Sequence, residues 1–470
     1  LRGQGHRGSA AGVDSHGAGM LVFVFPGQGS QWPGMARDLM AEEPVFRTAL
    51  RRCQDAMAPY VDWSLIDVLS DAAGARLDHI DVVQPALFAM QVSLAALWQS
   101  RGIAPDAVVG HSMGEVAAAH VAGILSLDDA ARIICVRSLL LRTLSGRGAM
   151  AVVDLDVEGA QRAITGFDDR VSIAVSNSRA STVLSGDPDA IDELMARLEA
   201  AGTFCRRVNV DVASHSPQVD VLLDELVAQL APIRPRPSTL PMMSTVTGGL
   251  ADGSELDAGY WAANLRRPVR FTEAVEALVV EGCTRFVELG PHPLLVGAAR
   301  EALDLAGCEG VVVASMRREA DGPVGMFAAL GELYANGQPV QWPRVHPPTA
   351  PADLPAYPWQ RERHWLEQAA GRHAVRRGAP ADSLLGWQLP IVDADALRVW
   401  ENRLTAHDAA AATGSDDADV LPHSLVVELL LRAAAALGAS SLRDVHLAPP
   451  LVMAGAATTV QVTARVGPDE

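Results

Sequence analysis

The sequence is poor in cysteine, with only five among 470 residues. They are Cys53, Cys135, Cys205, Cys283 and Cys308, and no two of them are spaced as C-x-x-C. This scattered, odd-numbered set argues against a disulfide framework and against a thiolate zinc site. We therefore expect a cytoplasmic protein without a bound metal.

Basic charge and long apolar runs are also scarce. Lysine and arginine total 38 against 56 acidic residues, which gives a formal net charge of −18. Because no basic stretch could neutralise a run of phosphates, we expect no nucleic-acid partner. No apolar run reaches the roughly 18 residues of a membrane span, and residues 1–20 lack the apolar core of a secretion signal. We expect no membrane partner either.

The chain is longer than one hydrophobic core usually organises, so two or three domains are expected. Residues 1–20 are rich in glycine, alanine and serine and predict a flexible linker. The apolar runs at 21–25 and 106–110 are typical of buried parallel strands, which indicates an α/β domain.

Residues 148–210 have a different pattern, which predicts strand, helix, strand, strand, helix and strand in that order. This is the order of a ferredoxin-like unit. We expect it as a small subdomain inserted between 21–147 and 211–300, which together form the large subdomain.

The chain becomes rich in proline from about residue 340, which favours an extended linker. We assign 301–366 to the end of the main domain and to this linker. Residues 367–470 resume an apolar pattern, notably the helical stretch 424–439, and predict a separate segment.

Gly110-His111-Ser112-Met113-Gly114 follows a predicted strand and precedes a helical segment at 115–125. This is the G-x-S-x-G pattern in the context of a nucleophile elbow, where a tight turn exposes the serine hydroxyl. The alternative is a serine that caps the helix.

Three further residues are candidates. Gln28 lies between two glycines after a strand, where a backbone N–H can approach a substrate. Arg137 lies in a mostly apolar helical stretch; it is either a surface residue or an inward one that needs a carboxylate partner. His215 follows Val-Ala-Ser, and a lone histidine is more often structural.

Together these segments resemble malonyl-CoA:carrier-protein transacylases, and specifically the acyltransferase domains of type I modular polyketide synthases. The segment at 357–365 resembles the linker that follows such domains. The segments that carry the resemblance are GQGSQWPGM (27–35), DVVQPALFAMQ (81–91), GHSMGE (110–115), Arg137, VASH (212–215), WAANLRRPVRF (261–271), ELGPHPLL (288–295) and YPWQRERHW (357–365).

The resemblance implies an α/β-hydrolase-like large subdomain and a serine–histidine mechanism. Ser112 would be the nucleophile and His215 its general base. The backbone carbonyl of Asn264 would orient the imidazole, and the backbone N–H groups of Gln28 and Met113 would form the oxyanion hole.

The resemblance also implies the substrates and partners. Arg137 would bind the free carboxylate of the acyl unit, and Gln84 would line the same site. The acyl group would move from acyl-CoA to Ser112 and then to the phosphopantetheine of an acyl carrier protein, beside a ketosynthase and other domains of the megasynthase. No cofactor would be bound to the domain itself.

In the resembled family, residues at the positions of 212–215 indicate which acyl side chain the site accepts. Malonyl-selective members resemble HAFH at this position and methylmalonyl-selective ones resemble YASH, whereas this chain has VASH. Val212 and Ser214 leave room for an α-branch, and Met113 can repack around varied groups. We expect an alkylmalonyl unit (methylmalonyl, ethylmalonyl or larger), as in broad-specificity domains of antimycin-type synthases. A methylmalonyl domain that tolerates valine is the alternative.

The stretches 384–390 and 404–414 resemble the start of a dehydratase of the double-hotdog type. That family requires H-x3-G-x4-P, whereas Gly414 and Pro422 lie too far from His407. We therefore expect an inactive or partial dehydratase-like segment, and His407 is otherwise a surface histidine. Two other functions stay open for the whole chain, a serine hydrolase or thioesterase and a non-catalytic module.

Overall fold

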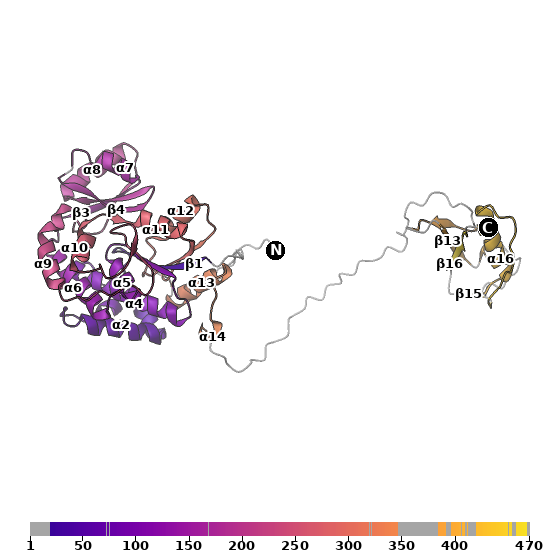
Figure 1. Ribbon diagram of the computed structural model, residues 1–470, viewed down its shortest axis with the longest axis horizontal. Helices are drawn as coiled ribbons and strands as arrows, with labels where there is room; N and C mark the ends of the chain where they lie inside the picture. Colours follow the sequence, from indigo (N-terminus) through magenta and orange to yellow (C-terminus); the bar gives the residue numbers. More distant parts are fainter. Residues whose placement is uncertain are drawn as a thin grey trace. The chain divides into compact units, whose positions relative to one another are not determined.

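The fold is described from a computed structural model (Figure 1). It describes residues 19–345 except 72, 75, 168, 319 and 321, and residues 384–467 except 392–395, 406, 409–410, 412–419, 450 and 454–456. The chain divides into two compact units, Leu1–Pro351 and Ala352–Glu470. Residues 1–18 of the predicted linker 1–20 and the segment 357–365 lie outside the described residues, whereas Met20 is the first residue of strand β1 (Met20–Phe25) and not part of a linker.

A six-stranded sheet forms the centre of the first unit, in the order β11-β10-β1-β2-β7-β8. The predicted strands at 21–25 and 106–110 are its neighbouring parallel strands β1 and β2. All neighbouring pairs are parallel except β7 with β8. The strands are β1 Met20–Phe25, β2 Ala107–Gly110, β7 Met242–Met243, β8 Leu250–Ala251, β10 Cys283–Glu288 and β11 Val311–Ala314.

Helices cover both faces of this sheet because its strands are apolar on both sides. Leu21, Phe23 and Phe25 pack with α2, α4, α5, α6 and α13, whereas Val22 and Val24 pack with α11 and α12. The helices of this unit outside the small subdomain are α1 Arg37–Glu42, α2 Pro44–Met57, α3 Leu65–Ser70, α4 Ile80–Ser100, α5 Gly114–Val121, α6 Leu127–Arg142, the 3-10 helix Pro217–Val219, α9 Asp220–Leu230, α10 Ala258–Arg266, α11 Phe271–Val280, α12 Val296–Leu305, α13 Gly322–Ala335 and α14 Trp342–Val345.

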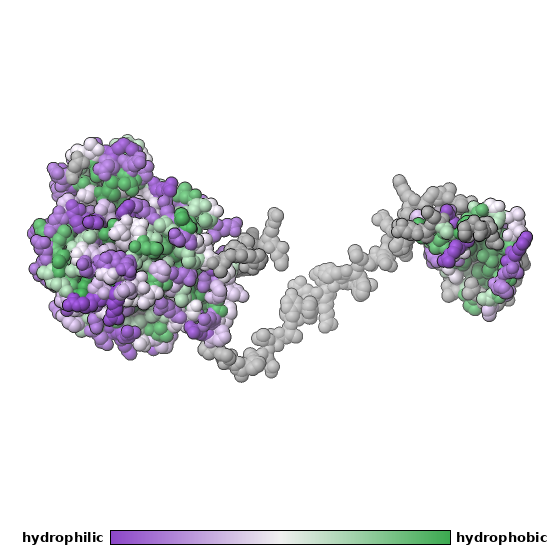
Figure 2. Space-filling view, in the orientation of Figure 1, coloured by the Kyte–Doolittle hydropathy of each residue, from purple (hydrophilic) through white to green (hydrophobic). Residues whose placement is uncertain are grey.

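Helix α4 is long and apolar enough to cross a membrane by length and composition alone. Within the first unit, however, 89% of its most apolar window is buried, and Leu87, Phe88 and Leu94 are part of the main core. It is therefore the central core helix of this unit. On the face of the first unit that Figure 2 shows, hydrophobic and hydrophilic residues are interspersed.

Residues 149–207 form a second, smaller sheet with the order β6-β3-β5-β4, to which β9 adds from outside the segment. Its elements are β3 Ala149–Val153, α7 Val157–Ala163, β4 Val171–Ser178, β5 Ser181–Gly186, α8 Pro188–Ala200 and β6 Cys205–Arg207. The predicted order of strands and helices is confirmed. The short strand β9 Val269–Arg270 was not predicted; it pairs in parallel with β4 and joins the small sheet to the rest of the unit.

The two faces of the small sheet have different roles, as strand β3 shows. Ala149, Ala151 and Val153 pack against α7 and α8, which lie on the outer side of the sheet (Figure 1). Met150 and Val152 alternate with them, point to the opposite face and line a cleft. One face of the small sheet is therefore a wall of that cleft.

The second unit contains the antiparallel sheet β12-β13-β16 and a separate pair, β14 with β15. Trp400 and Leu404 pack with Leu425 and Leu429 of the predicted helix. His407 is exposed, and Gly414 lies outside the described residues. The elements are β12 Trp387–Leu389, β13 Leu397–Thr405, β14 Val420–Leu421, α16 His423–Ala436, β15 Leu451–Val452 and β16 Ala457–Arg465.

Candidate active site

Ser112 occupies a sharp turn between β2 and α5. Its φ is 53°, in the left-handed region that few residues other than glycine adopt. The flanking glycines make the turn sterically possible. A Cβ at Gly110 would lie 2.3 Å from the backbone of Glu115, and one at Gly114 would lie 2.1 Å from the carbonyl oxygen of Phe25. The turn thus has the geometry of a nucleophile elbow, and Ser112 lines the cleft.

His215 lies beside this serine. The Ser112 hydroxyl and His215 Nε2 are 2.8 Å apart, and Nδ1 donates to the backbone carbonyl of Arg267 at 2.8 Å. Because Nδ1 carries the proton of that bond, Nε2 is free to accept one from Ser112. Burial, followed by the charge of Arg137, lowers the pKa of His215 to about 3, so the imidazole is neutral. The pair has the geometry of a nucleophile and its general base.

The prediction that the backbone carbonyl of Asn264 orients the imidazole is wrong. Asn264 lies inside α10, whereas Arg267 is the residue just after the helix, where carbonyl groups have no partner within the helix. The Arg267 carbonyl is therefore available to His215. The side chain of Asn264 instead points inward, and its Nδ2 donates to the Ser112 carbonyl at 3.2 Å.

Arg137 is buried, not a surface residue, with 2% of its area exposed. Its Nη1 donates to Asn264 Oδ1 and its Nη2 donates to the Ser112 hydroxyl at 3.2 Å. Its Nε has no partner within the described residues. Burial lowers its pKa to about 10, which leaves the guanidinium charged at neutral pH. A buried cation with a free N–H beside Ser112 is suited to an anionic group of a ligand.

The expected carboxylate partner of Arg137 does not contact it directly. Among the described residues no carboxylate lies within ion-pair distance; the charge of Glu115 acts on Arg137 across the side chain of Asn264. Glu115 accepts hydrogen bonds from Asn264 Nδ2 at 2.7 Å, the Tyr260 hydroxyl at 2.8 Å and the Thr245 hydroxyl at 2.8 Å. Sequence reasoning quoted Glu115 within GHSMGE but gave it no role.

A cleft of about 830 Å³ contains the serine and the histidine. Gln28 and Met113 flank it, and neither backbone N–H donates to a protein acceptor in the part of the chain that the structure describes. The structure brings together at the cleft eight of the nine predicted site residues, all but Asn264: Gln28, Gln84, Ser112, Met113, Arg137, Val212, Ser214 and His215.

Comparison with known proteins decides the family. The profile of the acyl transferase domain matches residues 22–339, more than half of the chain. The chain belongs to the acyl transferase domain family.

The relatives of this acyltransferase are type I modular polyketide synthases. It is 44% identical to polyketide synthase GfsB of Streptomyces halstedii over 448 residues. This aligned region covers 93% of the chain and 8% of the relative. It is 45% identical over 411 residues to erythronolide synthase EryA3 of Saccharopolyspora erythraea, which covers 86% of the chain and 12% of the relative. The chain thus spans only a small part of these relatives.

Solved acyltransferase domains have the same α/β fold. The domain from module 8 of the salinomycin polyketide synthase matches with a TM-score of 0.67 at 46% identity, over 69% of this chain and 77% of that one. A loading acyltransferase of the avermectin synthase matches with a TM-score of 0.65 at 44% identity, over 67% and 99%. The acyltransferase is therefore a transferase that resembles these domains in both sequence and fold.

Sequence reasoning did not identify the residues by which the small sheet of the acyltransferase lines the cleft. The cleft-lining residues of this sheet include Met150, Val152, Val175 and Val183. Their alternation along β3, β4 and β5 was visible in the sequence, but which face of a small sheet meets a second subdomain is decided by tertiary packing.

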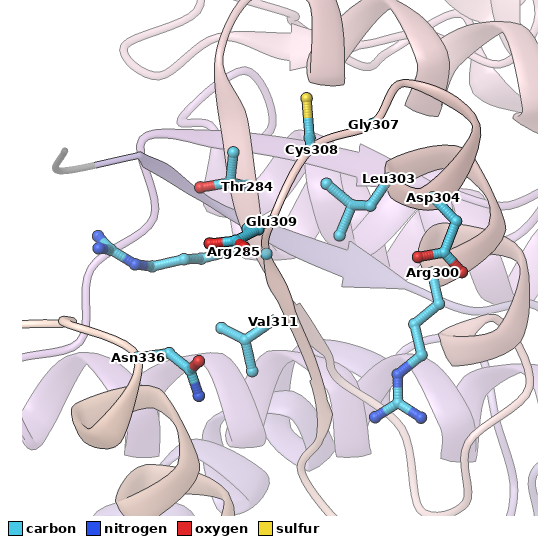
Figure 3. A pocket seen from close by; sticks show the side chains of 11 residues that line it. Thr284, Arg285, Arg300, Leu303, Asp304, Gly307, Cys308, Glu309, Val311 and Asn336 are labelled. Atoms are coloured by element: carbon cyan, nitrogen blue, oxygen red, sulfur yellow. The ribbon is translucent and has the colours of Figure 1, made fainter. Parts of the chain in front are cut away.

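A second cavity, of about 480 Å³, lies where β10 and β11 begin (Figure 3). Ser112 comes just after the C-terminal end of strand β2, whereas this cavity lies at the N-terminal ends of β10 and β11. Because β2, β1, β10 and β11 run parallel, the cavity is at the edge of the sheet opposite to Ser112. The guanidinium groups of Arg285 and Arg300 lie on opposite sides of it and donate to the backbone carbonyls of Gly19 and Val312. Its lining contains no paired nucleophile and base.

Proposed function

We propose that this acyltransferase takes an alkylmalonyl unit from coenzyme A onto Ser112 and passes it to the phosphopantetheine thiol of an acyl carrier protein. The single observation that carries the proposal is the buried, charged Arg137, which has an unpaired Nε beside the Ser112–His215 pair. Serine and histidine alone would suit any acyl transfer, whereas the arginine selects an acyl group that bears a carboxylate.

Acylation starts when His215 Nε2 accepts the proton of Ser112, and the serine oxygen attacks the thioester carbonyl. The backbone N–H groups of Gln28 and Met113 donate to the oxygen that becomes negative; loss of one such donor typically adds about 2.7–4 kcal/mol to the barrier. The intermediate collapses, the CoA sulfur leaves, and His215 returns the proton to it. The carrier thiol then attacks the Ser112 ester by the same steps in reverse.

Arg137 would hold the carboxylate of the acyl unit through Nε and Nη2. An acyl group without a carboxylate would leave this buried cation unpaired, which disfavours it. Gln84 supports the same assignment, because its Oε1 is buried at the cleft without a partner in the described part of the chain. With a bound carboxylate, the amide of Gln84 can rotate to donate to it.

The alkyl branch would lie against Val212 and Ser214, beside the apolar wall of the small sheet. Absence of the aromatic rings that other members carry at these positions supports an α-branch larger than methyl. The acyltransferase domain of SpnD was solved in complex with 2-(pent-4-yn-1-yl)malonyl and is 31% identical to this chain, with a TM-score of 0.63. A bulky alkylmalonyl unit is therefore compatible with the fold.

The donor would be an acyl-CoA. Arg206 of β6 and Arg318, which follows β11, line the cleft. Cations at this position in a chain of net charge −18 favour the phosphates of a nucleotide-bearing thioester.

The proposal also covers the fold type of each part of the chain. We assign the six-stranded part to an α/β-hydrolase-like subdomain, residues 148–210 to a ferredoxin-like one, and the second unit to a partial, inactive dehydratase-like hotdog. The polyketide synthase relatives support an acyl carrier protein and a ketosynthase as partners.

Intact-protein mass spectrometry after incubation with acyl-CoAs tests the function. We expect adducts from methylmalonyl-, ethylmalonyl- and longer alkylmalonyl-CoA, none with Ser112→Ala, and none from acetyl-CoA. Adducts that hydrolyse faster than they move to a carrier protein would support a thioesterase. Absence of any adduct would support a non-catalytic module.

A further inference from the structure

Glu115 is a fully buried carboxylate that the acyl-transfer steps do not use. Four donors face it: the backbone N–H and hydroxyl of Thr245, the hydroxyl of Tyr260 and Nδ2 of Asn264. Burial raises its pKa, and these hydrogen bonds oppose the rise. Because all four neighbours donate, the environment fits the ionised form, which only accepts.

The amide of Asn264 has one orientation that satisfies its neighbours. Its Nδ2 donates to Glu115 and to the Ser112 carbonyl, neither of which can donate in return. Its Oδ1 accepts from Nη1 of Arg137, which can only donate. A flipped amide would place donor against donor and acceptor against acceptor. Glu115 therefore fixes which side of Asn264 meets the arginine.

This arrangement leaves part of the guanidinium unoccupied. A carboxylate in direct contact with Arg137 would use two of its N–H groups in a bidentate pair and would compete with the substrate. With Asn264 between the two charges, Glu115 compensates the cation without contacting it; Nη1 donates to Asn264 and Nη2 donates to the Ser112 hydroxyl. Nη2 stays beside Ser112, and Nε has no partner among the described residues.

We propose that Glu115 is a positioning residue, which acts through the side chain of Asn264 to hold Arg137 charged and open toward the cleft, and so sets the preference for carboxylated acyl groups. This inference rests on the proposed function, because it assigns the selectivity of the same site. It also gives Asn264 a role different from the one expected from its backbone.

The test compares methylmalonyl-CoA with propionyl-CoA, which has the same carbon branch without the carboxylate. In Glu115→Gln the amide can satisfy only some of the four donors, and the negative charge is lost. We expect kcat/KM for Ser112 acylation by methylmalonyl-CoA to fall at least tenfold, with a change of less than threefold for propionyl-CoA. An equal fall for both substrates, or an unchanged ratio, would overturn the proposal.

A second variant keeps the test informative if Glu115→Gln does not fold. In Glu115→Gln with Asn264→Asp, the buried charge is retained but moved next to Arg137, and the introduced glutamine amide can donate to the new carboxylate. The direct ion pair occupies the arginine, so the methylmalonyl-to-propionyl ratio should again fall at least tenfold. A wild-type ratio in this double variant would contradict the proposal.

Tyr260→Phe is the matched control. It removes one hydrogen bond to the same carboxylate but leaves the contacts of Asn264 and Arg137, so stability should fall while the selectivity ratio stays within about twofold. A tenfold loss of the ratio here would indicate a merely structural role for Glu115. Failure of the proposed function is distinguishable, because the wild-type protein would then not be acylated by methylmalonyl-CoA at all.

Discussion

Ser112 and His215 share an unusual backbone. Of the three residues other than glycine with positive φ in the described ranges, two are this pair, at 53° and 61°. Such conformations are strained by about 1–3 kcal/mol each and persist only where surrounding contacts enforce them. For His215 those contacts are its N–H to the Leu265 carbonyl and the bond from Ser185 to the Ser214 carbonyl. Contacts from α10 and from the small sheet therefore hold the backbone of His215.

The low pKa of His215 gives a prediction for the pH dependence of acylation. A base must be neutral to accept the serine proton, and a pKa of about 3 keeps His215 neutral throughout pH 5–8. A histidine with the ordinary pKa of about 6.5 would be only about 3% neutral at pH 5 and would lose about thirtyfold in rate. We expect kcat/KM for methylmalonyl-CoA to change less than threefold between pH 5 and 7.5, measured by stopped-flow release of CoA.

Glu288 needs a control in this experiment, because burial raises its pKa to about 7. It accepts from the backbone N–H groups of Leu294, Leu295 and Val296 beside the cleft. If kcat/KM falls near pH 7 in the wild-type protein but not in Glu288→Gln, the fall is due to titration of Glu288 and its effect on residues 294–296. A thirtyfold fall centred near pH 6.5 in both proteins would contradict the low pKa of His215.

Val212 gives a prediction for the size of the acyl side chain. It is buried and lines the cleft, so a ring at this position would occupy space assigned to the alkyl branch. In Val212→Tyr we expect acylation by hexylmalonyl-CoA to fall at least tenfold relative to methylmalonyl-CoA, within the range that apolar pockets discriminate. Competition of the two substrates, followed by mass spectrometry, measures the ratio. An unchanged ratio would place the branch elsewhere.

At the scale of elements, the start of α5 is fixed by steric contact. Gly114→Ala would place a Cβ 2.1 Å from the carbonyl oxygen of Phe25 in β1, so helix and strand would have to separate. We expect a loss of at least about 3 kcal/mol in stability, as for severe overpacking, and loss of acylation. Gly297→Ala, at an exposed position of α12 where no atom outside the helix's own backbone lies within 4 Å of the added Cβ, is the control and should gain up to about 1 kcal/mol. Chemical denaturation measures both; equal stabilities would contradict the contact.

Elements were predictable where local pattern determines them. The apolar run of β1 and the alternation in β3 to β5 gave the right strands, and Ser112 followed from the turn that its glycines permit. Strand β9, with two residues, has too little pattern to predict. The contacts of Asn264 depend on where α10 ends and packs against α5, which no local signal encodes. Arg137 was ambiguous for the same reason, since its compensating charge lies in another helix.

The net charge of the whole chain affects how an anionic donor binds at the cleft. The net charge of −18 repels an anionic donor, whereas Arg206 of β6 and Arg318 just after β11 line the cleft. Exposed charge contacts contribute about 0.2–1 kcal/mol each. We therefore expect Arg206→Ala and Arg318→Ala each to raise KM for methylmalonyl-CoA about two- to fivefold, more so together, and less at high salt.

A thioester without the nucleotide separates this effect from damage to the cleft. With methylmalonyl-pantetheine, both variants should match the wild-type protein, because the phosphates that the arginines would contact are absent. Arg162→Ala, at an exposed position of α7 outside the cleft lining, is the charge-matched control and should change neither KM. Equal losses with both thioesters would mean that the arginines shape the cleft itself; a wild-type KM for the CoA ester would mean that the nucleotide lies away from them.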